Sequence, residues 1–171
     1  RDVFAMLTPE AILKTCRLAN EAARCFRKSV GSTGEPRIGV CALNPHAGED
    51  GLFGDEEQRI IRPAVERGIA EGLPLVGPLP ADTLMVRARD GEFDAVVAMY
   101  HDQGHIALKL LGMHRAVNVT LGLPIVRTSV AHGTAFDRAW RGQADSGGMV
   151  AAITVAAELA QRGFVGQVHR T

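Results

Sequence analysis

The sequence predicts an α/β fold in which a sheet is sandwiched by helices. Short runs of branched and small apolar residues at 37–43 and 94–99 have the composition of strands that are buried on both faces. Other segments, above all 9–28 and 146–162, place apolar residues at the spacing of an amphipathic helix. The chain has 171 residues, 46% of them hydrophobic, which is enough to bury one core.

The first predicted helix begins with Thr8 as a capping residue, followed by a proline in the first turn and by Glu10. It is expected to run to about Lys28, and a glycine-containing turn then leads into the strand at 37–43. This turn is not a dinucleotide-binding fingerprint. In that fingerprint a strand precedes the glycines, whereas in this chain the strand follows them. The other expected elements are helices at 55–71, 82–88 and 146–162, and strand-like segments at 75–76, 94–99, 117–121 and 125–130. The inward side of the last helix is expected to consist of Met149, Ile153, Ala156, Ala157 and Ala160.

Two of the predicted strands end in loops that carry histidine. The strand at 94–99 is followed by the run YHDQGH, and the strand at 37–43 by NPHAGE. Ligands in open α/β sheets bind outside the carboxyl ends of the strands. Neutral imidazoles from separate loops commonly hold zinc, cobalt or a similar divalent ion. His46 and His101 are therefore candidate metal ligands, although a third ligand must come from elsewhere, and surface histidines that cap a helix are the alternative.

The strand at 125–130 carries a single charge, Arg127, which needs an anionic partner or a path to water. A substrate carboxylate or phosphate would match its guanidinium group, whereas an ion pair with an internal acid is the structural alternative. His132, Gly133 and Thr134 follow this strand and offer backbone N–H groups and a hydroxyl that suit a phosphate. The three strand ends, at 44–49, 99–105 and 127–134, are expected to converge on one side of a single sheet.

Composition and charge exclude several classes of protein. The 19 basic and 19 acidic residues argue against an electrostatic nucleic-acid binder. No apolar run reaches the roughly 18 residues that a transmembrane helix requires. Cys16, Cys25 and Cys41 are odd in number and lack CxxC spacing, which favours a reduced, cytoplasmic setting.

Four ordered runs resemble the 4-hydroxythreonine-4-phosphate dehydrogenase (PdxA) family of NAD-dependent and metal-dependent dehydrogenases. They are NPHAGEDGLFGDEE from 44, GPLPADT from 77, AMYHDQGH from 98, and VNVTLGLPIVRTSVAHGTAFD from 117. The resemblance implies a fold similar to isocitrate and isopropylmalate dehydrogenases, with two α/β lobes around a cleft. It also implies a homodimer with shared active sites, NAD or NADP as cofactor, and a divalent metal such as Zn, Co, Mg or Mn.

The resemblance also implies roles for individual residues. His46 and His101 match two of the family's three metal-binding histidines. Substrate-binding positions are matched by Lys109, Asn118 and Arg127. Catalytic positions near the reacting hydroxyl are matched by Asp82 and Asp102, with Lys109 as a further proton carrier. His132, Gly133 and Thr134 are the residues expected to bind the cofactor.

The chain departs from the family at its start. The family's third metal histidine lies just before an Arg-Asp-Val stretch, and this chain begins at Arg1. Residues 1–171 are therefore expected to be the carboxyl-terminal portion of such a dehydrogenase, a single α/β unit that comprises one lobe and part of the second. Without the amino-terminal half, the chain alone is expected to be inactive.

The resemblance leaves the substrate open between branches of the family. His105 and an intact VNVTLGLP run resemble the branch that acts on 4-phosphorylated threonate or erythronate more than the pyridoxine biosynthesis enzymes. The expected reaction is oxidation with decarboxylation of a phosphorylated four-carbon hydroxy acid. Alternatives are a cis-dihydrodiol dehydrogenase of the terephthalate type, a metal-dependent hydrolase that uses a bound water, and an inactive dimerisation fragment.

Overall fold

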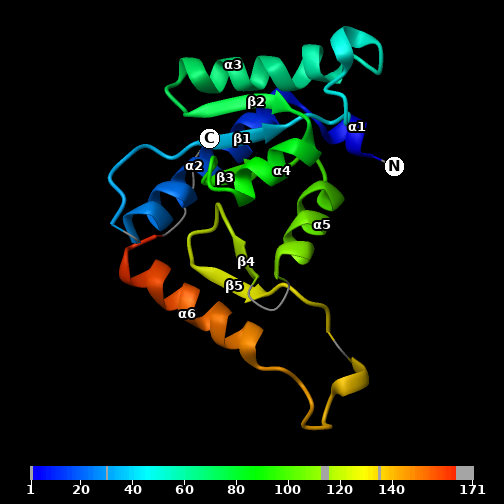
Figure 1. The fold of residues 1–171 in the computed structure, drawn as a ribbon. Helices are drawn as coiled ribbons and strands as arrows, with labels where there is room; N and C mark the ends of the chain where they lie inside the picture. The colour runs from blue at the N-terminus through cyan, green and yellow to red at the C-terminus, as the bar shows by residue number, and fades with distance from the viewer. Residues whose placement is uncertain (1, 30, 113–115, 135, 165–171) are drawn as a thin grey trace. The chain divides into compact units, whose positions relative to one another are not determined.

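The computed structural model describes residues 2–29, 31–112, 116–134 and 136–164 (Figure 1). The chain divides into two compact units, residues 1–105 and 106–171, and the boundary falls inside helix α5 (His101–Gly112). The expectation that residues 1–171 are one α/β unit of a larger dehydrogenase stays a prediction. Among the described residues, no helix combines the length and the apolarity needed to cross a bilayer.

The first unit contains a parallel three-stranded sheet. Its strands are β1 (Ile38–Cys41), β2 (Leu75–Leu79) and β3 (Ala95–Val97), in the order β2-β1-β3. Both neighbours run parallel to β1, with Ile38 opposite Leu75 on one side and opposite Ala95 on the other. All four residues of β1 are buried, as expected for a central strand covered on both faces.

The helices of the first unit are α1 (Val3–Met6), α2 (Pro9–Ser29), α3 (Arg62–Ala70) and α4 (Ala81–Arg89). A 3-10 turn spans Glu49–Gly51, and a π-helical segment, Glu57–Ile61, leads directly into α3. The helices predicted at 9–28 and 55–71 are therefore confirmed. A proline lies in the first turn of α3, and because it has no N–H to donate to the preceding turn, it stands where the π-helical segment gives way to the α-helix.

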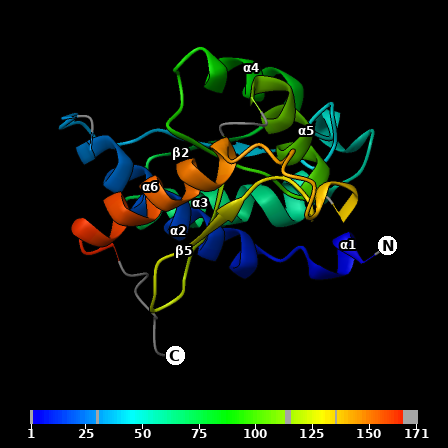
Figure 2. The same cartoon turned by 90° about the horizontal axis from the view of Figure 1, so that it is seen from below.

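Helices cover both faces of this sheet (Figure 2). Ile38 and Val40 of β1 pack in one cluster with residues of α2 and α3, whereas Cys41 packs with Leu84 of α4 and with Phe93. A Cβ atom on Gly39 would lie 2.6 Å from Leu84 Cδ1, so glycine at this position lets α4 approach the strand closely. The predicted sandwich of helices around a sheet is present in this unit.

The second unit contains an antiparallel hairpin and one long helix. Strands β4 (Val117–Thr120) and β5 (Arg127–Val130) pair with each other, and α6 (Gly147–Gln161) packs against both. A 3-10 turn at Phe136–Arg138 lies between β5 and α6. The prediction that all three strand ends belong to one sheet was wrong, because β5 pairs in this separate two-stranded sheet.

Helix α6 has the predicted extent but a different inward side. Its buried residues are Ala152 and Leu159, whereas Met149 and Ile153 are more than half exposed. The hydroxyl of Thr128 donates a hydrogen bond of 2.9 Å to the carbonyl of Ala152, which fixes this side of the helix against β5. Because α6 is apolar almost all round, hydrophobicity alone did not identify the buried side.

Candidate functional site

The first histidine loop begins where β1 ends. Asn44 holds it, since its Oδ1 accepts the N–H of His46 at 2.8 Å and its Nδ2 donates to the carbonyl of Phe53 at 2.9 Å. The His46 ring stacks on Phe53 with ring centroids 5.1 Å apart. Its Nδ1 lies 2.7 Å from Oε1 of Glu49, and the imidazole is more than half exposed.

The second histidine begins helix α5, directly beyond β3. Nδ1 of His101 lies 2.8 Å from Oδ1 of Asp102, and its ring stacks on His105 with centroids 4.0 Å apart. The two rings meet because residues four positions apart lie on the same side of a helix. The imidazole of His101 is also largely exposed.

Both predicted metal ligands therefore have the same arrangement. In each, one ring nitrogen contacts a carboxylate, which leaves Nε2 of His46 and Nε2 of His101 available for an ion. Such carboxylate–histidine pairs are common around protein-bound metals, because the carboxylate fixes the tautomer and raises the basicity of the ligand. Among the described residues, no cluster of three or more His, Cys, Asp or Glu side chains is arranged to hold a metal. The metal roles of His46 and His101 stay predictions.

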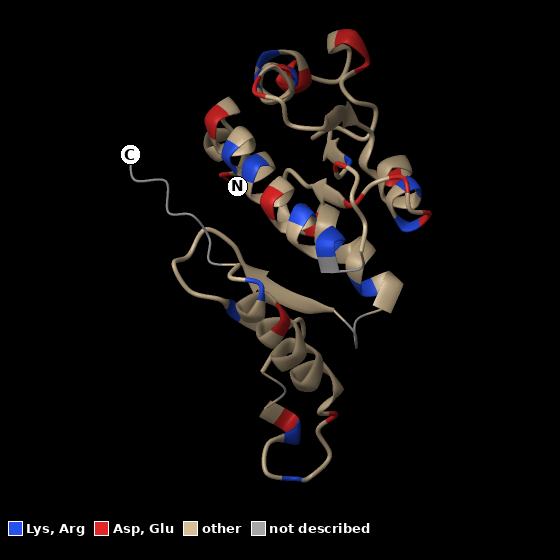
Figure 3. Ribbon diagram, turned by 90° about the vertical axis from the view of Figure 1, so that its left-hand side faces the viewer, with Lys and Arg blue, Asp and Glu red and all other residues tan. Residues whose placement is uncertain are grey.

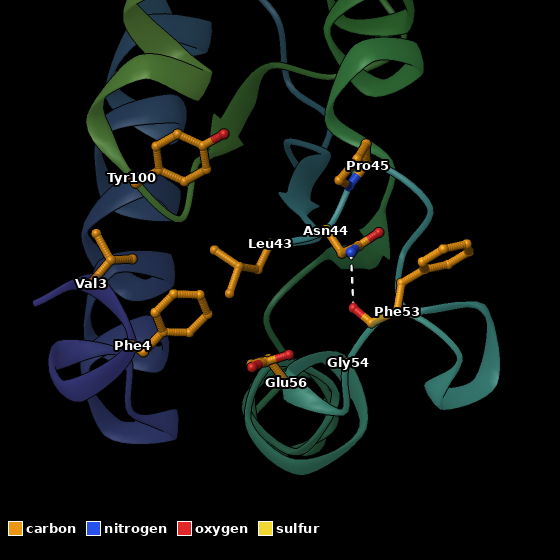
Figure 4. Close-up of a pocket in the computed structure, with 9 residues that line it drawn as sticks. All are labelled: Val3, Phe4, Leu43, Asn44, Pro45, Phe53, Gly54, Glu56 and Tyr100. Atoms are coloured by element: carbon orange, nitrogen blue, oxygen red, sulfur yellow. Dashed lines mark hydrogen bonds between the residues drawn. The ribbon is translucent and has the colours of Figure 1, made fainter. Parts of the chain in front are cut away.

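The loops before the two histidines open on one pocket. This pocket of the first unit has a volume of about 460 Å³, and its lining includes Asn44 and Pro45 from one loop and Tyr100 from the other (Figure 4). Most of the remaining wall is apolar, with Glu56 as its one acidic residue among those described. The remaining lining residues are Val3, Phe4, Leu43, Phe53 and Gly54.

Asp82 lies elsewhere in the first unit. It occupies the first turn of α4, where its Oδ1 accepts the N–H of Thr83 at 2.6 Å. It lines a shallow hollow with Thr83, Val86 and Arg87, and it is not among the residues around the pocket of Asn44 and Tyr100. In this structure Asp82 is an exposed acid of the first helical turn that bonds only to the neighbouring N–H among the described residues, and its catalytic role stays a prediction.

The predicted substrate-binding residues of the hairpin share one face. Asn118 is paired with Ser129 and Thr120 with Arg127, and side chains two positions apart along a strand point the same way. Arg127 donates a hydrogen bond of 2.8 Å to the hydroxyl of Thr120. Thr128, the next residue of β5, points to the opposite face and to α6. The hairpin thus presents an exposed guanidinium and an exposed amide on the face away from α6.

Charges are sparse around this polar face (Figure 3). Across β4, β5 and α6 the sequence has only Arg127 and Glu158 as charged residues. Lys109 lies in the last turn of α5, where it is exposed and forms no ion pair with any described residue. Both cations are therefore available to an anion, although the roles predicted for Lys109, Asn118 and Arg127 stay untested.

The residues predicted to bind the cofactor form an exposed loop after β5. Nδ1 of His132 lies 2.8 Å from the carbonyl of Gly133, and Thr134 is exposed. A Cβ atom on Gly148 would lie 3.7 Å from the His132 ring, so this ring sits beside the first turn of α6. The positive end of a helix dipole there suits an anionic group, and the assignment to the cofactor stays a prediction.

Sequence reasoning missed two residues that shape the site, Glu57 and Gln103. Glu57 is 1% exposed and accepts hydrogen bonds from the backbone of Leu43 and Asn44. Gln103 bonds to the backbone of Ala42 and Met99. Both occur in runs that were recognised, but an acid at a helix start and a glutamine among histidines give no local signal of contacts this distant in sequence.

The buried cysteines are poor candidates for nucleophiles. Burial raises the pKa of the Cys16 thiol and of the Cys41 thiol to about 11. Both thiols are therefore protonated at neutral pH, and the reactive form of a cysteine is the thiolate. They belong to the packing of the core.

Comparison with known proteins places the chain in a family of dehydrogenases. Residues 1–156 match the family described as pyridoxal phosphate biosynthetic protein PdxA, so the chain belongs to the PdxA family. D-threonate 4-phosphate dehydrogenase of Salmonella typhimurium is 56% identical over 138 residues, which are 81% of this chain and 42% of that protein.

Two solved structures are also similar. The crystal structure of 4-hydroxythreonine-4-phosphate dehydrogenase from Klebsiella pneumoniae has a TM-score of 0.80 and 50% identity, and the match covers 94% of this chain and 47% of that one. A terephthalate 1,2-cis-dihydrodiol dehydrogenase from Burkholderia xenovorans has a TM-score of 0.62 and 30% identity over 96% of this chain and 49% of that one. The chain thus spans less than half the length of these relatives.

Proposed function

We propose that this chain is the carboxyl-terminal part of an enzyme that oxidises a 4-phosphorylated four-carbon hydroxy acid with NAD or NADP. The substrate is D-threonate 4-phosphate or its close analogue 4-hydroxythreonine 4-phosphate. The observation that carries this proposal is the identity of 50% or more to relatives with both names. His105 in the YHDQGH run favours the threonate compound, which we therefore place first.

The two carboxylate–histidine pairs support a role for a divalent ion such as Zn, Co, Mg or Mn. His46 and His101 would hold it through Nε2, with Glu49 and Asp102 fixing the opposite nitrogens. When bound, such an ion lowers the pKa of a coordinated hydroxyl and stabilises negative charge on its oxygen. In this arrangement Asp102 orients His101, which leaves Lys109 and Asp82 as the further candidates to accept the substrate proton.

The hairpin supports recognition of a phosphorylated acid. Arg127 carries a planar fork of N–H donors, Asn118 presents an amide beside it on the same face, and both are exposed. Lys109 adds a cation. Loss of carbon dioxide from a substrate carboxylate beta to the new ketone would follow hydride transfer. His132, Gly133 and Thr134 are the residues proposed to contact the nicotinamide cofactor.

The greater length of the relatives supports a proposal that further groups of the site come from outside this chain. The proposal therefore includes an isocitrate dehydrogenase-like arrangement of two lobes, completion of the site by an amino-terminal half, and a homodimer with shared sites. We also propose that the 171 residues alone are inactive. The odd number of cysteines and their lack of CxxC spacing support a cytoplasmic location.

The test is a turnover assay on the chain joined to the amino-terminal half of a PdxA relative. We expect NADH formation with D-threonate 4-phosphate in the presence of a divalent ion, and its loss in His46→Ala and in His101→Ala. The control is Gln58→Ala, which changes an exposed residue of the same unit that has no proposed role. Wild-type metal content and rate in both test variants would refute the metal assignment.

The alternative is oxidation of an aromatic cis-dihydrodiol, favoured by the similarity to the terephthalate dihydrodiol dehydrogenase. The two functions are separated by the substrate that is turned over and not by the need for Arg127, because the carboxylates of a terephthalate dihydrodiol also match a guanidinium group. Arg127→Met should lower kcat/KM for the phosphorylated acid by about tenfold to a hundredfold, since a charge-assisted contact contributes about 1.5 to 3 kcal/mol. NADH formation with the dihydrodiol and none with either phosphorylated acid would favour the alternative.

A further inference from the structure

A glutamine in the histidine-rich run links the ends of two strands. Oε1 of Gln103 accepts the N–H of Met99 at 2.8 Å, and its Nε2 donates to the carbonyl of Ala42 at 2.8 Å. Met99 lies just beyond β3 and two residues before His101, whereas Ala42 follows β1. A backbone N–H must meet the amide oxygen and a carbonyl must meet the amide nitrogen, so only one orientation of this side chain satisfies both.

The buried side chain of Glu57 also contacts the end of β1, through the backbone N–H groups of the two residues that follow Ala42. Oε1 of Glu57 accepts the N–H groups of Leu43 at 2.9 Å and of Asn44 at 2.8 Å. Asn44 in turn accepts the N–H of His46, so two hydrogen bonds connect Glu57 to the candidate ligand. Oε2 of Glu57 is buried, has no hydrogen-bond partner among the described residues, and lies where a Cβ on Gly48 would be 3.0 Å away.

We infer that Gln103 and Glu57 are positioning residues that brace the ends of β1 and β3 and so fix the loops that present His46 and His101. Gln103 joins the two strand ends to each other, and Glu57 joins the His46 loop to the helix that follows it. Neither side chain is a proposed ligand or proton carrier. The metal consequence rests on the proposed function, whereas the bracing of the two loops does not.

The physical basis is the cost of leaving a buried backbone group without a partner. Met99 is 8% exposed and Ala42 is fully buried, so neither backbone group has easy access to water if Gln103 is removed. Charge-assisted bonds such as those from Leu43 and Asn44 to Glu57 are stronger than neutral ones. Loss of the hydrogen bonds of Gln103 or of Glu57 should therefore increase the motion of the loops that carry His46 and His101, while the hydrophobic core stays intact.

The decisive experiment is amide hydrogen exchange, followed by NMR on the 171-residue chain. Gln103→Met removes both hydrogen bonds at nearly constant volume, and Gln103→Glu keeps the acceptor for Met99 but has no donor for Ala42. Gln58→Met is the matched control, because Gln58 is exposed in the same unit. Circular dichroism reports whether each variant keeps its fold.

Gln103→Met should speed exchange about tenfold or more at Met99 and also at His46, which lies 57 positions earlier in the chain. Gln103→Glu should speed exchange at His46 while Met99 stays protected. Effects confined to Met99 in both variants, or exchange equal to that of Gln58→Met, would overturn the link. Complete unfolding of both variants would also overturn it, since the residue would then serve folding rather than local positioning.

The second brace is tested with Glu57→Gln, which keeps an acceptor of the same size but loses the charge. Exchange at Leu43 and Asn44 should increase about tenfold, and Glu66→Gln, an exposed acid on α3, should leave it unchanged. Equal exchange in the two variants would refute the role of Glu57.

Cobalt titration of the enzyme completed with its amino-terminal half gives an independent reading. Disruption of outer groups around a metal typically weakens binding by about 10-fold to 100-fold, which we expect for Gln103→Met and Glu57→Gln. Absence of cobalt binding in the unmutated enzyme would refute the proposed metal site while leaving the exchange results to decide the bracing. If the unmutated enzyme binds cobalt but amide exchange is unchanged in Gln103→Met and Glu57→Gln, only the positioning role of these two residues would be refuted.

Discussion

At the scale of the residue, Gly48 illustrates how tightly the His46 loop is built. Its φ of 80° lies in the left-handed region, and an added Cβ would meet Glu57 Oε2 at 3.0 Å and the carbonyl of Gly54 at 3.1 Å. Gly48→Ala should therefore destabilise the chain by about 1 to 3 kcal/mol, from backbone strain and crowding together. Urea unfolding measures this.

The control for this substitution is Gly112→Ala, since no atom lies within 4 Å of a Cβ built there. It should change the free energy of unfolding by less than about 1 kcal/mol, because alanine is favoured over glycine in a helix. Equal effects at the two positions would contradict the account given for Gly48.

Asp94 should make stability depend on pH. Partial burial raises the pKa of its carboxyl, but the N–H of Arg37 and the guanidinium of Arg27 outweigh this and hold the pKa below its ordinary value of 3.8. Stability from this group is therefore complete above about pH 4 and is lost as pH falls through the lower folded pKa. Asp94→Asn should cost about 1 to 2 kcal/mol at pH 7.

The measurement is urea unfolding of Asp94→Asn and the unmutated chain between pH 7 and pH 3. The difference in unfolding free energy should shrink toward the acid end. Asp55→Asn is the control, since that carboxylate is 61% exposed and its contacts with Arg59 are long. A difference that stays constant with pH would rule out the charge as its cause.

At the scale of the element, the contact of α4 with the sheet depends on one side chain. Leu84 is fully buried against Gly39, whose lack of a side chain makes room for it. Leu84→Ala should destabilise the chain by about 2 to 5 kcal/mol, because it leaves a cavity that the sheet cannot fill. Thermal and urea unfolding give this value, and Val86→Ala, on the exposed side of the same helix, should cost far less.

Periodicity predicted most elements and missed one pairing. The strands at 38–41 and 95–97 follow from short continuous runs of apolar residues, and the helix at 9–29 follows from apolar residues repeated at helical spacing. The pairing of β4 with β5 does not follow from such a run, but the length of the loop between the two strands determines it. Six residues separate these strands, and a parallel crossover needs a dozen or more, so only an antiparallel hairpin fits.

The candidate site was predictable only where its contacts are local. His46 with Glu49 and His101 with Asp102 lie within three positions in sequence, so a histidine beside a nearby acid was visible. Gln103 reaches Ala42 across 61 positions. Such a contact depends on β1 and β3 being neighbours in the sheet, and the order of strands is not contained in the pattern of any single segment.

At the scale of the whole molecule, an exposed apolar side of α6 supports the proposed homodimer. Met149, Val150 and Ile153 are 51%, 59% and 61% exposed, and their spacing places them on one side of the helix. Exposed apolar clusters of this kind commonly mark protein interfaces. We expect the chain to sediment as a dimer at micromolar concentration.

Analytical ultracentrifugation of Met149→Glu/Ile153→Glu tests which surface is responsible. The double variant should sediment as a monomer while keeping its circular dichroism spectrum, because the substituted side chains are exposed. Ile69→Glu, which changes an equally exposed residue of α3, should remain dimeric. A monomeric unmutated chain would refute the dimer, and a dimeric double variant would place the contact on another surface.

The hydrogen bonds from Glu57 and Gln103 have a thermodynamic consequence for the proposed ion. Small zinc domains gain their fold from the metal and unfold when it is chelated. Here protein groups already order the loops beside His46 and His101, so little conformational entropy is left to lose when an ion arrives. Folding and metal loading would then be separate events, and the metal could leave and return while the polypeptide stays folded.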